Sequence, residues 1–167
     1  MGQSNPSHLG KIEKNIKDLK DVLKGDDTLL DAGCYWGDLF GYLKHPKYHG
    51  IDIVQANIDE ARRVYLDHRG CTFERKDILE LEGSWDVIFC SRVLMHIPPW
   101  EEAIKRMLAC AKKYLVLVVP LGGYNCSVEM HGGEPVYFQR FSPSQFDGFG
   151  KCTLHKYHRY STVIFEK

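Results

Sequence analysis

Segments typical of strands alternate with segments typical of helices along most of this chain, and this alternation limits its fold more than any other feature. The strand-like segments are residues 28–33, 48–53, 71–75, 84–90 and 114–119. The helix-like segments between and before them are residues 9–23, 37–44, 55–68 and 98–111. Strands and helices that alternate in this way form an α/β fold, with a parallel sheet covered by helices on both faces.

The pattern changes after Pro120. Residues 121–140 are rich in glycine and irregular, which predicts a long loop of a kind that is often functional. Ser142 favours a short capped helix that begins there and reaches Phe146. We expect residues 151–157 and 160–166 to form a closing antiparallel pair of strands.

Size and charge narrow the class of protein. A length of 167 residues is typical of one domain, here residues 1–167 with a flexible tail at residues 1–6. Lys plus Arg and Asp plus Glu are both 22, and this balance disfavours a dedicated nucleic-acid binder, which needs a basic surface. The sequence contains neither an apolar run long enough for a membrane span nor the apolar core of a signal peptide, so we expect a soluble, cytoplasmic protein.

The spacing of cysteines and histidines predicts no metal site. Six cysteines are scattered without a Cys-x-x-Cys pair, as expected of free thiols in a reducing compartment. His155 and His158 are three residues apart in a segment expected to be a strand, where they would tend to face opposite ways.

The most informative segment runs from Asp31 to Gly37, where a strand ends, the chain turns on glycines and a helix begins. Such a turn lets the backbone approach a ligand closely, and the start of a helix offers free N–H groups. A dinucleotide-binding loop has glycines at its first, third and sixth positions. Those positions are Gly33, Tyr35 and Asp38 here, so two of the three do not match.

Another family has glycines at the first, third and fifth positions of this loop. Two of these three positions match here, because Gly33 is the first and Gly37 the fifth. The segment resembles motif I of the class I S-adenosylmethionine-dependent methyltransferases, and the resemblance extends from Leu29 to Pro120. The matching segments after motif I are Gly50–Ile53, Lys76–Ile78, Trp85–Ser91 and Val93–Pro98, the last similar to the family's type 11 branch. The resemblance implies a Rossmann-like methyltransferase fold with a mostly parallel seven-stranded sheet, the last strand antiparallel.

The resemblance also implies a site for S-adenosylmethionine, which leaves as S-adenosylhomocysteine. Asp52 would accept the ribose hydroxyls, although an Asp that merely forms a turn is the alternative. Asp77 and Ile78 would contact adenine, although Asp77 also suits a helix cap. The other residues implied in cofactor binding, each with a plain packing or turn role as its alternative, are Asp31, Gly33, Cys34, Tyr35, Gly37, Ile53, Cys90 and Ser91.

Tyr35 is the main departure from the family pattern, because it replaces the middle glycine. If this position needs a positive φ, a tyrosine there is strained, and its ring could fill part of the cofactor pocket. Two histidines are candidate catalytic residues. His96 follows the fourth strand and either contacts the acceptor, acts as a base or is structural. His131 lies between Glu129 and Glu134 in the predicted loop, where a merely solvent-exposed residue is the alternative.

The Asp/Asn-Pro-Pro-Tyr sequence of amino-methylating members of the family is missing after the fourth strand, where Cys90–Val93 stands. We therefore expect a small-molecule acceptor. A methyltransferase acting on RNA or protein is one alternative, suggested by the basic residues Arg62, Arg63, Arg69, Arg75 and Lys76. The others are a non-catalytic module that binds S-adenosylmethionine and, disfavoured by the glycine spacing, a nicotinamide oxidoreductase. The oligomeric state is not apparent from the sequence.

Overall fold

The computed structural model describes residues 10–123 and 125–167, so the predicted tail at residues 1–6 lies outside the described residues. The α-helices are α2 (Glu13–Val22), α3 (Asp38–Leu43), α4 (Gln55–Val64) and α5 (Trp100–Cys110). The strands are β1 (Leu29–Ala32), β2 (Tyr48–Asp52), β3 (Cys71–Arg75), β4 (Trp85–Ser91), β5 (Ala111–Val119), β6 (Asn125–His131), β7 (Glu134–Arg140), β8 (Cys152–His155) and β9 (Ser161–Glu166). The 3-10 helices are η1 (Ile78–Glu80), η2 (Leu94–His96) and η3 (Pro143–Phe149).

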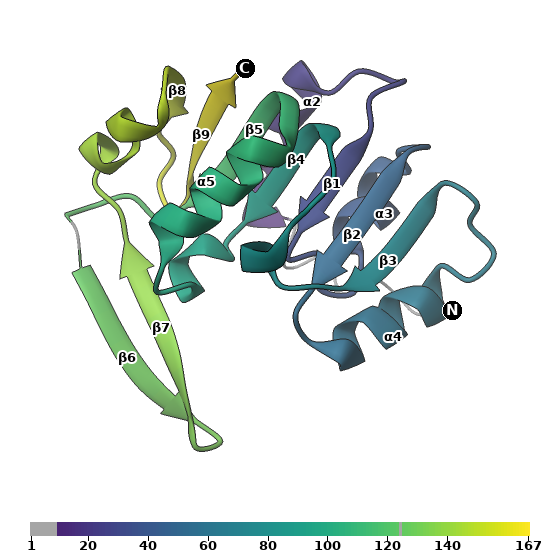
Figure 1. Cartoon of the computed structure of the whole chain (residues 1–167), viewed down its shortest axis with the longest axis horizontal. Coiled ribbons are helices and arrows are strands. Elements are labelled where there is room, and N and C mark those ends of the chain that lie inside the picture. The colour runs from purple at the N-terminus through teal and green to yellow at the C-terminus, as the bar shows by residue number, and fades with distance from the viewer. Residues whose placement is uncertain (1–9, 124) are drawn as a thin grey trace.

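Seven strands form one sheet in the order β3-β2-β1-β4-β5-β9-β8 (Figure 1). The first five pair in parallel, whereas β9 pairs antiparallel with both of its neighbours, β5 and β8. This arrangement confirms the predicted mostly parallel seven-stranded sheet with an antiparallel last strand, and it confirms the closing pair of strands. Among the described residues, no helix is both long and apolar enough to cross a membrane.

Strands β1 and β4 bury apolar side chains on both faces of the sheet because helices cover both faces. In β4, Ile88 and Cys90 point into a core formed with α5, while Val87 and Phe89 point into a core formed with α2, α3 and α4. In Figure 1, α5 crosses in front of the sheet and α2 lies behind it. The predicted helices on both faces are thereby confirmed.

A buried carboxylate joins α2 to the C-terminal strands. Asp18 is 4% exposed and accepts hydrogen bonds from Tyr157 Oη (2.9 and 3.0 Å), Thr162 Oγ1 (2.5 Å) and His155 Nδ1 (2.8 Å). Asn15, one turn earlier on α2, donates to Thr162 Oγ1 at 2.8 Å. The helical pattern of the sequence places Asp18 on the polar face, yet the last strands of the sheet cover that position.

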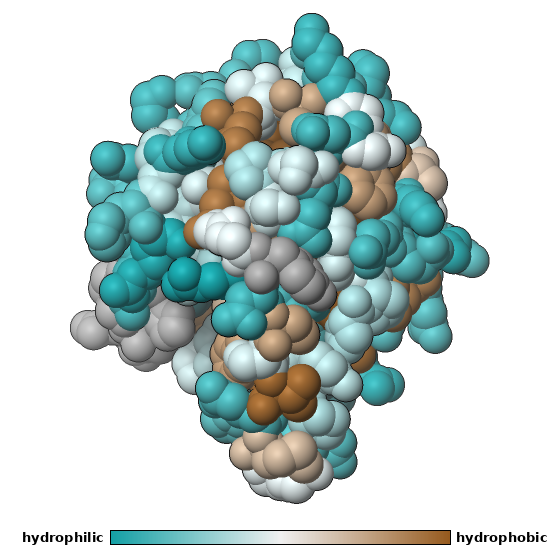
Figure 2. All heavy atoms as spheres, turned by 90° about the vertical axis from the view of Figure 1, so that its left-hand side faces the viewer, coloured by the Kyte–Doolittle hydropathy of each residue, from teal (hydrophilic) through white to brown (hydrophobic). Residues whose placement is uncertain are grey.

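The prediction of an irregular loop over residues 121–140 is wrong. β6 and β7 form an antiparallel hairpin, in which His131 pairs with Glu134 across the two-residue turn Gly132-Gly133. The hairpin projects from the body of the protein (Figures 1 and 2), and its exposed apolar residues on β6 are Val128 and Met130. The predicted capped helix is present as η3, and Ser142 and Gln145 form its capping box.

Candidate active site

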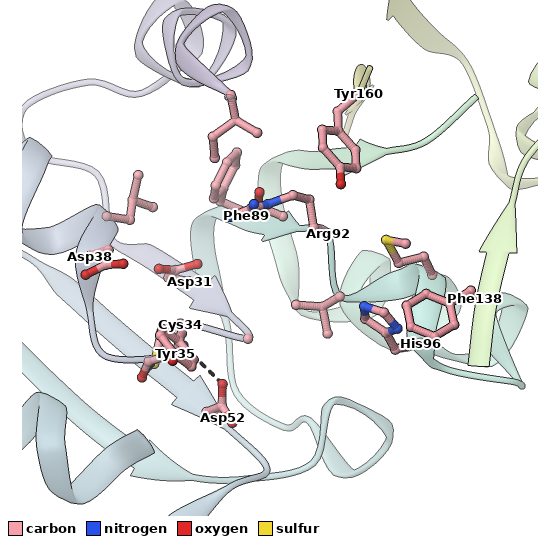
Figure 3. A pocket seen from close by; sticks show the side chains of 16 residues that line it. Asp31, Cys34, Tyr35, Asp38, Asp52, Phe89, Arg92, His96, Phe138 and Tyr160 are labelled. Atoms are coloured by element: carbon pink, nitrogen blue, oxygen red, sulfur yellow. Dashed lines mark hydrogen bonds between the residues drawn. The ribbon is translucent and has the colours of Figure 1, made fainter. Parts of the chain in front are cut away.

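Loops at the carboxyl ends of β1, β2 and β4 surround a cavity of about 490 Å³ (Figure 3). A second cavity, of about 300 Å³, adjoins it, and Gly33, Asp52, Val93 and His96 line both. Open α/β sheets bind ligands outside the carboxyl ends of their strands, at the point where the strand order reverses. That point lies between β1 and β4 in this sheet, so the two cavities form one groove where this class of fold binds ligands.

Local packing explains the two glycines of the loop after β1. Gly33 (φ +86°) and Gly37 (φ +78°) both have left-handed backbones, which favour glycine. A methyl group on Gly33 would lie 2.1 Å from Val93 Cγ2, and one on Gly37 would lie 2.8 Å from a ring carbon of Tyr65. Gly33 lines both cavities, whereas Gly37 lines neither. Gly37 thus packs under the groove and is not placed to contact a ligand in it.

Tyr35, at the position of the missing glycine, has the positive φ expected there (+52°). A left-handed backbone costs an L-residue roughly 1–2 kcal/mol. The Tyr35 main-chain N–H donates a 3.0 Å hydrogen bond to Asp52 Oδ2, and its ring stacks on Trp36 with ring centroids 4.6 Å apart. The side chain is 44% exposed and borders the larger cavity without closing it.

Asp52, at the end of β2, is held by donors on two sides. Its Oδ2 accepts from Tyr35 N, and its Oδ1 accepts from Val54 N at 2.9 Å and from Asn57 Nδ2 at 3.2 Å. A carboxylate offers about four acceptor positions, so Asp52 keeps acceptor capacity for a ligand. Because Asp52 lines both cavities, a molecule that spans the groove must pass this carboxylate.

The smaller cavity has apolar walls and one carboxylate. Ile53, Ile78 and Pro98 contribute apolar surface, and Ile53 is 57% exposed. Asp77 Oδ1 accepts a 2.9 Å hydrogen bond from Leu79 N and so caps η1, the alternative role considered for this residue. Asp77 also lines the cavity, so the cap and a ligand contact are compatible.

Asp31 lines the larger cavity although it is only 4% exposed. Burial raises the pKa of Asp31 to about 7, although the Tyr48 hydroxyl donates a 2.6 Å hydrogen bond to Oδ2, which favours the ionised form. The nearby carboxylates of Asp52 and Asp38 raise this pKa further. A carboxyl group that titrates near neutral pH is stabilised as an anion by a cationic ligand beside it.

Ser91 and Arg92 also line the larger cavity, and Arg92 faces Asp31 across it (Figure 3). Arg92 has a left-handed backbone (φ +60°), and its guanidinium carbon lies 5.9 Å from the centre of the Tyr160 ring. Ser91 Oγ and Arg92 Nε are buried without a hydrogen-bond partner among the described residues. Buried polar atoms rarely remain unpaired, so both atoms suggest a ligand. Sequence analysis gave Arg92 no role, because one arginine after a strand carries no signal.

His96, at the end of η2, lines both cavities, and its ring is oriented by β7. Its Nδ1 lies 2.7 Å from the main-chain oxygen of Tyr137, and its ring meets Phe138 edge to face with centroids 5.1 Å apart. A carbonyl oxygen can only accept, so Nδ1 carries the hydrogen and Nε2 of the neutral ring has the free lone pair. Figure 3 shows His96 beside Phe138, facing Asp52 and Tyr35 across the cavity.

Two predicted site residues lie away from the groove. His131 lies at the tip of the hairpin, 3.2 Å from Glu129, and lines none of the cavities. Cys90 is completely buried in the sheet, and burial raises its pKa to about 12. Cys34 does line the larger cavity, and burial raises its pKa also, so neither thiol is an activated nucleophile.

Sequence comparison identifies the family. Residues 7–152 match a family model described as "Methyltransferase domain". The chain belongs to this family. A search of curated proteins finds no match. The family confirms the resemblance that motif I and the segments after it indicated, and it makes this chain a methyltransferase domain.

Solved structures share the fold at low sequence identity. The PH0226 protein from Pyrococcus horikoshii OT3 has a TM-score of 0.74 and 15% identity, covering 95% of this chain and 90% of that one. An S-adenosylmethionine dependent methyltransferase from Mesorhizobium loti has a TM-score of 0.70 and 13% identity, covering 90% and 96%. Magnesium protoporphyrin IX methyltransferase from Synechocystis PCC 6803, with bound S-adenosylhomocysteine, has a TM-score of 0.68 and 16% identity, covering 98% and 88%. The methyltransferase domain therefore has the Rossmann-like methyltransferase fold.

Proposed function

We propose that this methyltransferase domain binds S-adenosylmethionine in the groove and methylates a small-molecule acceptor. The observation that carries the proposal is the pair of adjoining cavities that meet at Asp52. An apolar cavity joined to a larger one with charged walls suits a ligand with a flat ring at one end and charged groups at the other. The Synechocystis enzyme of the same fold has S-adenosylhomocysteine bound.

The charged and unpaired groups of the larger cavity suit the amino-acid end of this cofactor. Asp31 and Arg92 lie on facing sides of the cavity (Figure 3). The Asp31 carboxylate would pair with the ammonium group, while Ser91 Oγ and Arg92 Nε, both buried and unpartnered among the described residues, would donate to the carboxylate. The residues present therefore fit the cofactor.

The ribose and adenine of the cofactor would lie at Asp52 and in the smaller cavity. Asp52 has acceptor capacity for the ribose hydroxyls, and Asp77 and Ile78 line the cavity that would take adenine. S-adenosylmethionine, when bound, supplies a methyl group made electrophilic by its sulfonium. The task of the protein is to hold the acceptor's nucleophilic atom in line with that methyl, and orientation alone supplies on the order of 7–11 kcal/mol in favourable cases.

We assign His96 as the general base. Hydrogen bonding of Nδ1 to the Tyr137 carbonyl leaves Nε2 unprotonated in the neutral ring, and the ring lines the groove. Nε2 can then take the proton of an acceptor hydroxyl or amine as the nucleophile attacks. A base contributes only where the nucleophile arrives protonated, typically 10²- to 10⁴-fold.

Basic side chains that suggested a macromolecular acceptor are largely occupied within the fold. Arg62 donates twice to the main-chain oxygen of Phe73 (3.0 and 2.7 Å), and Arg63 pairs with Glu60. Arg75 donates to the main-chain oxygen of Ile53 at 3.1 Å. These contacts supply structural roles for three of the five basic residues, which favours a small acceptor.

Calorimetric titration with S-adenosylmethionine and S-adenosylhomocysteine tests the cofactor site. We expect micromolar binding, about −8 kcal/mol, that falls at least tenfold in Asp52→Ala. Asp67→Ala, which removes an exposed carboxylate that lines none of the cavities, is the matched control and should bind normally. Absence of binding by the wild type, or full binding by Asp52→Ala, contradicts the proposed site.

The base is tested in His96→Gln. We expect the rate of S-adenosylhomocysteine release with an active acceptor to fall by a factor of roughly 10² or more, while cofactor affinity changes less than threefold. An unchanged rate would show that His96 only shapes the groove.

A further inference from the structure

A third cavity, of about 230 Å³, opens beside the proposed cofactor cavity. The two share Met95, Phe138 and Tyr160 as a common wall. The third cavity lies at the base of the β6–β7 hairpin, where Asn125 begins β6 and Arg140 ends β7. Its size is below the roughly 300–1,000 Å³ of pockets that hold drug-sized ligands, so it suits a small molecule or one part of a larger one.

The charged residues that line this cavity are all basic, unlike those of the cofactor cavity. Arg140 and Arg159 line it, and its lining includes no Asp or Glu. Neither arginine forms an ion pair with a described carboxylate. The cofactor cavity instead has Asp31, Asp38 and Asp52 on its wall beside the single Arg92. The cofactor cavity is therefore lined mainly by acidic residues, whereas the third cavity, beyond the shared wall, has only basic charges.

Contacts with η2 fix the base of the hairpin against the groove. Gln139 is 2% exposed, and its Nε2 donates a 2.7 Å hydrogen bond to the main-chain oxygen of Ile97. The neighbouring Tyr137 carbonyl accepts from His96 Nδ1 at 2.7 Å. Arg140 follows Gln139 directly, so its backbone is positioned by the same strand that orients the proposed base. A preorganised site loses less entropy when a ligand binds.

The aromatic wall between the two cavities can hold the body of a ligand. Figure 3 shows the Tyr160 side chain directed into the larger cavity and Phe138 beside His96. Phe138 and Tyr160 also line the third cavity. A flat acceptor lying against these rings would have one end near Arg140 and Arg159 and the other near His96.

We propose that the methyl acceptor carries an anionic group, a carboxylate or a phosphate, which Arg140 and Arg159 bind in the third cavity. Planar guanidinium groups match the oxygens of either anion through paired hydrogen bonds. The acceptor's nucleophilic atom then lies on the His96 side of the aromatic wall. This proposal rests on the proposed methyltransferase function and adds the chemical class of its acceptor.

Three ring compounds of similar size test the anion site by ligand-observed NMR: benzoate, phenyl phosphate and the neutral benzamide. Each is titrated into the full chain with and without S-adenosylhomocysteine. We expect at least one anion to bind tenfold more tightly than benzamide, and the double variant Arg140→Gln/Arg159→Gln to lose that preference. Arg69→Gln, an exposed arginine that lines none of the cavities, is the control and should keep it. Whichever anion binds more tightly identifies the group.

The outcomes separate this proposal from the proposed function. Equal binding of benzamide and the anions, or an unchanged preference in the double variant, overturns the anion site even if S-adenosylhomocysteine binds normally. If the wild type does not bind S-adenosylhomocysteine but still prefers an anion to benzamide, the methyltransferase function is refuted and the anion site is kept. A single-stranded RNA oligomer that binds more tightly than both anions, with affinity falling steeply as salt rises, would overturn the small acceptor.

Discussion

Replacing Asp31 by Asn should stabilise the protein and weaken its cofactor binding. Burial raises the pKa of Asp31 from an ordinary 3.8 to about 7. Each pKa unit corresponds to 1.36 kcal/mol, so ionising Asp31 in the folded protein costs about 4 kcal/mol more than in the unfolded chain. An amide has nearly the same shape, still accepts from the Tyr48 hydroxyl and carries no charge.

The free energy of unfolding should depend on pH through Asp31. The folded state binds a proton at Asp31 more tightly than the unfolded state, so the free energy of unfolding of the wild type falls as the pH rises from about 4 to about 7. Above pH 7 the loss is complete. The advantage of Asp31→Asn should therefore be near zero at pH 4 and reach up to about 4 kcal/mol at pH 8.

Urea unfolding of the wild type and Asp31→Asn at half-unit steps between pH 4 and pH 8.5 measures this difference, and other titrating groups cancel in the comparison. Calorimetry at pH 8 should show at least tenfold weaker S-adenosylmethionine binding by the variant, because the ammonium group loses its partner. A stability difference that does not change with pH would refute the pKa argument. Normal cofactor affinity would refute the position of the ammonium group.

Three further substitutions test the groove and the core. Gly33→Ala should cost about 2–5 kcal/mol of unfolding free energy, because its methyl would lie 2.1 Å from Val93 Cγ2 and its backbone would keep φ +86°. Adding Val93→Ala should remove the steric clash but not the backbone strain, and urea unfolding midpoints measure both changes. Asp18→Ala should cost about 2–4 kcal/mol by leaving three donors unpaired, whereas the exposed Asp21→Ala on the same helix should shift the thermal midpoint little. Asp86→Asn should cost about 2 kcal/mol at pH 7, because main-chain and side-chain donors from Thr28 lower the pKa of Asp86 to about 2; that cost should vanish as the pH falls from 4 towards 2, and a constant cost would contradict it.

The alternation of strands and helices and the loop after the first strand could be predicted because they depend on local patterns. Gly33, Asp52 and Asp77 were located by their match to the family motifs at the ends of predicted strands, and all three line the groove. The hairpin was missed although Gly132-Gly133 is a two-residue turn with both φ values positive (+59° and +89°), a strong hairpin signal. Most of β6 is exposed, so no run of buried apolar residues drew attention to it.

Contacts between distant segments could not be predicted from patterns. The helical spacing puts Asp18 on the polar face of a helix, but residues about 140 positions later in the chain bury it. Arg140 and Arg159 lie 19 residues apart in the sequence, and only the hairpin and the turn before β9 bring them to one cavity. His131 was proposed as a site residue because it lies near Glu129 and Glu134 in a predicted loop, whereas the hairpin places it at the tip.

The position of β9 in the sheet has a consequence for synthesis on the ribosome. β9 lies between β5 and β8 but follows both in the chain, so the edge of β5 stays unpaired until Ser161–Glu166 have emerged. That edge includes the continuous apolar run Tyr114–Val119, and an exposed apolar strand edge readily pairs with other chains. We expect the nascent chain to depend on chaperones until its last strand is made, and to aggregate when translation stalls between residues 120 and 160.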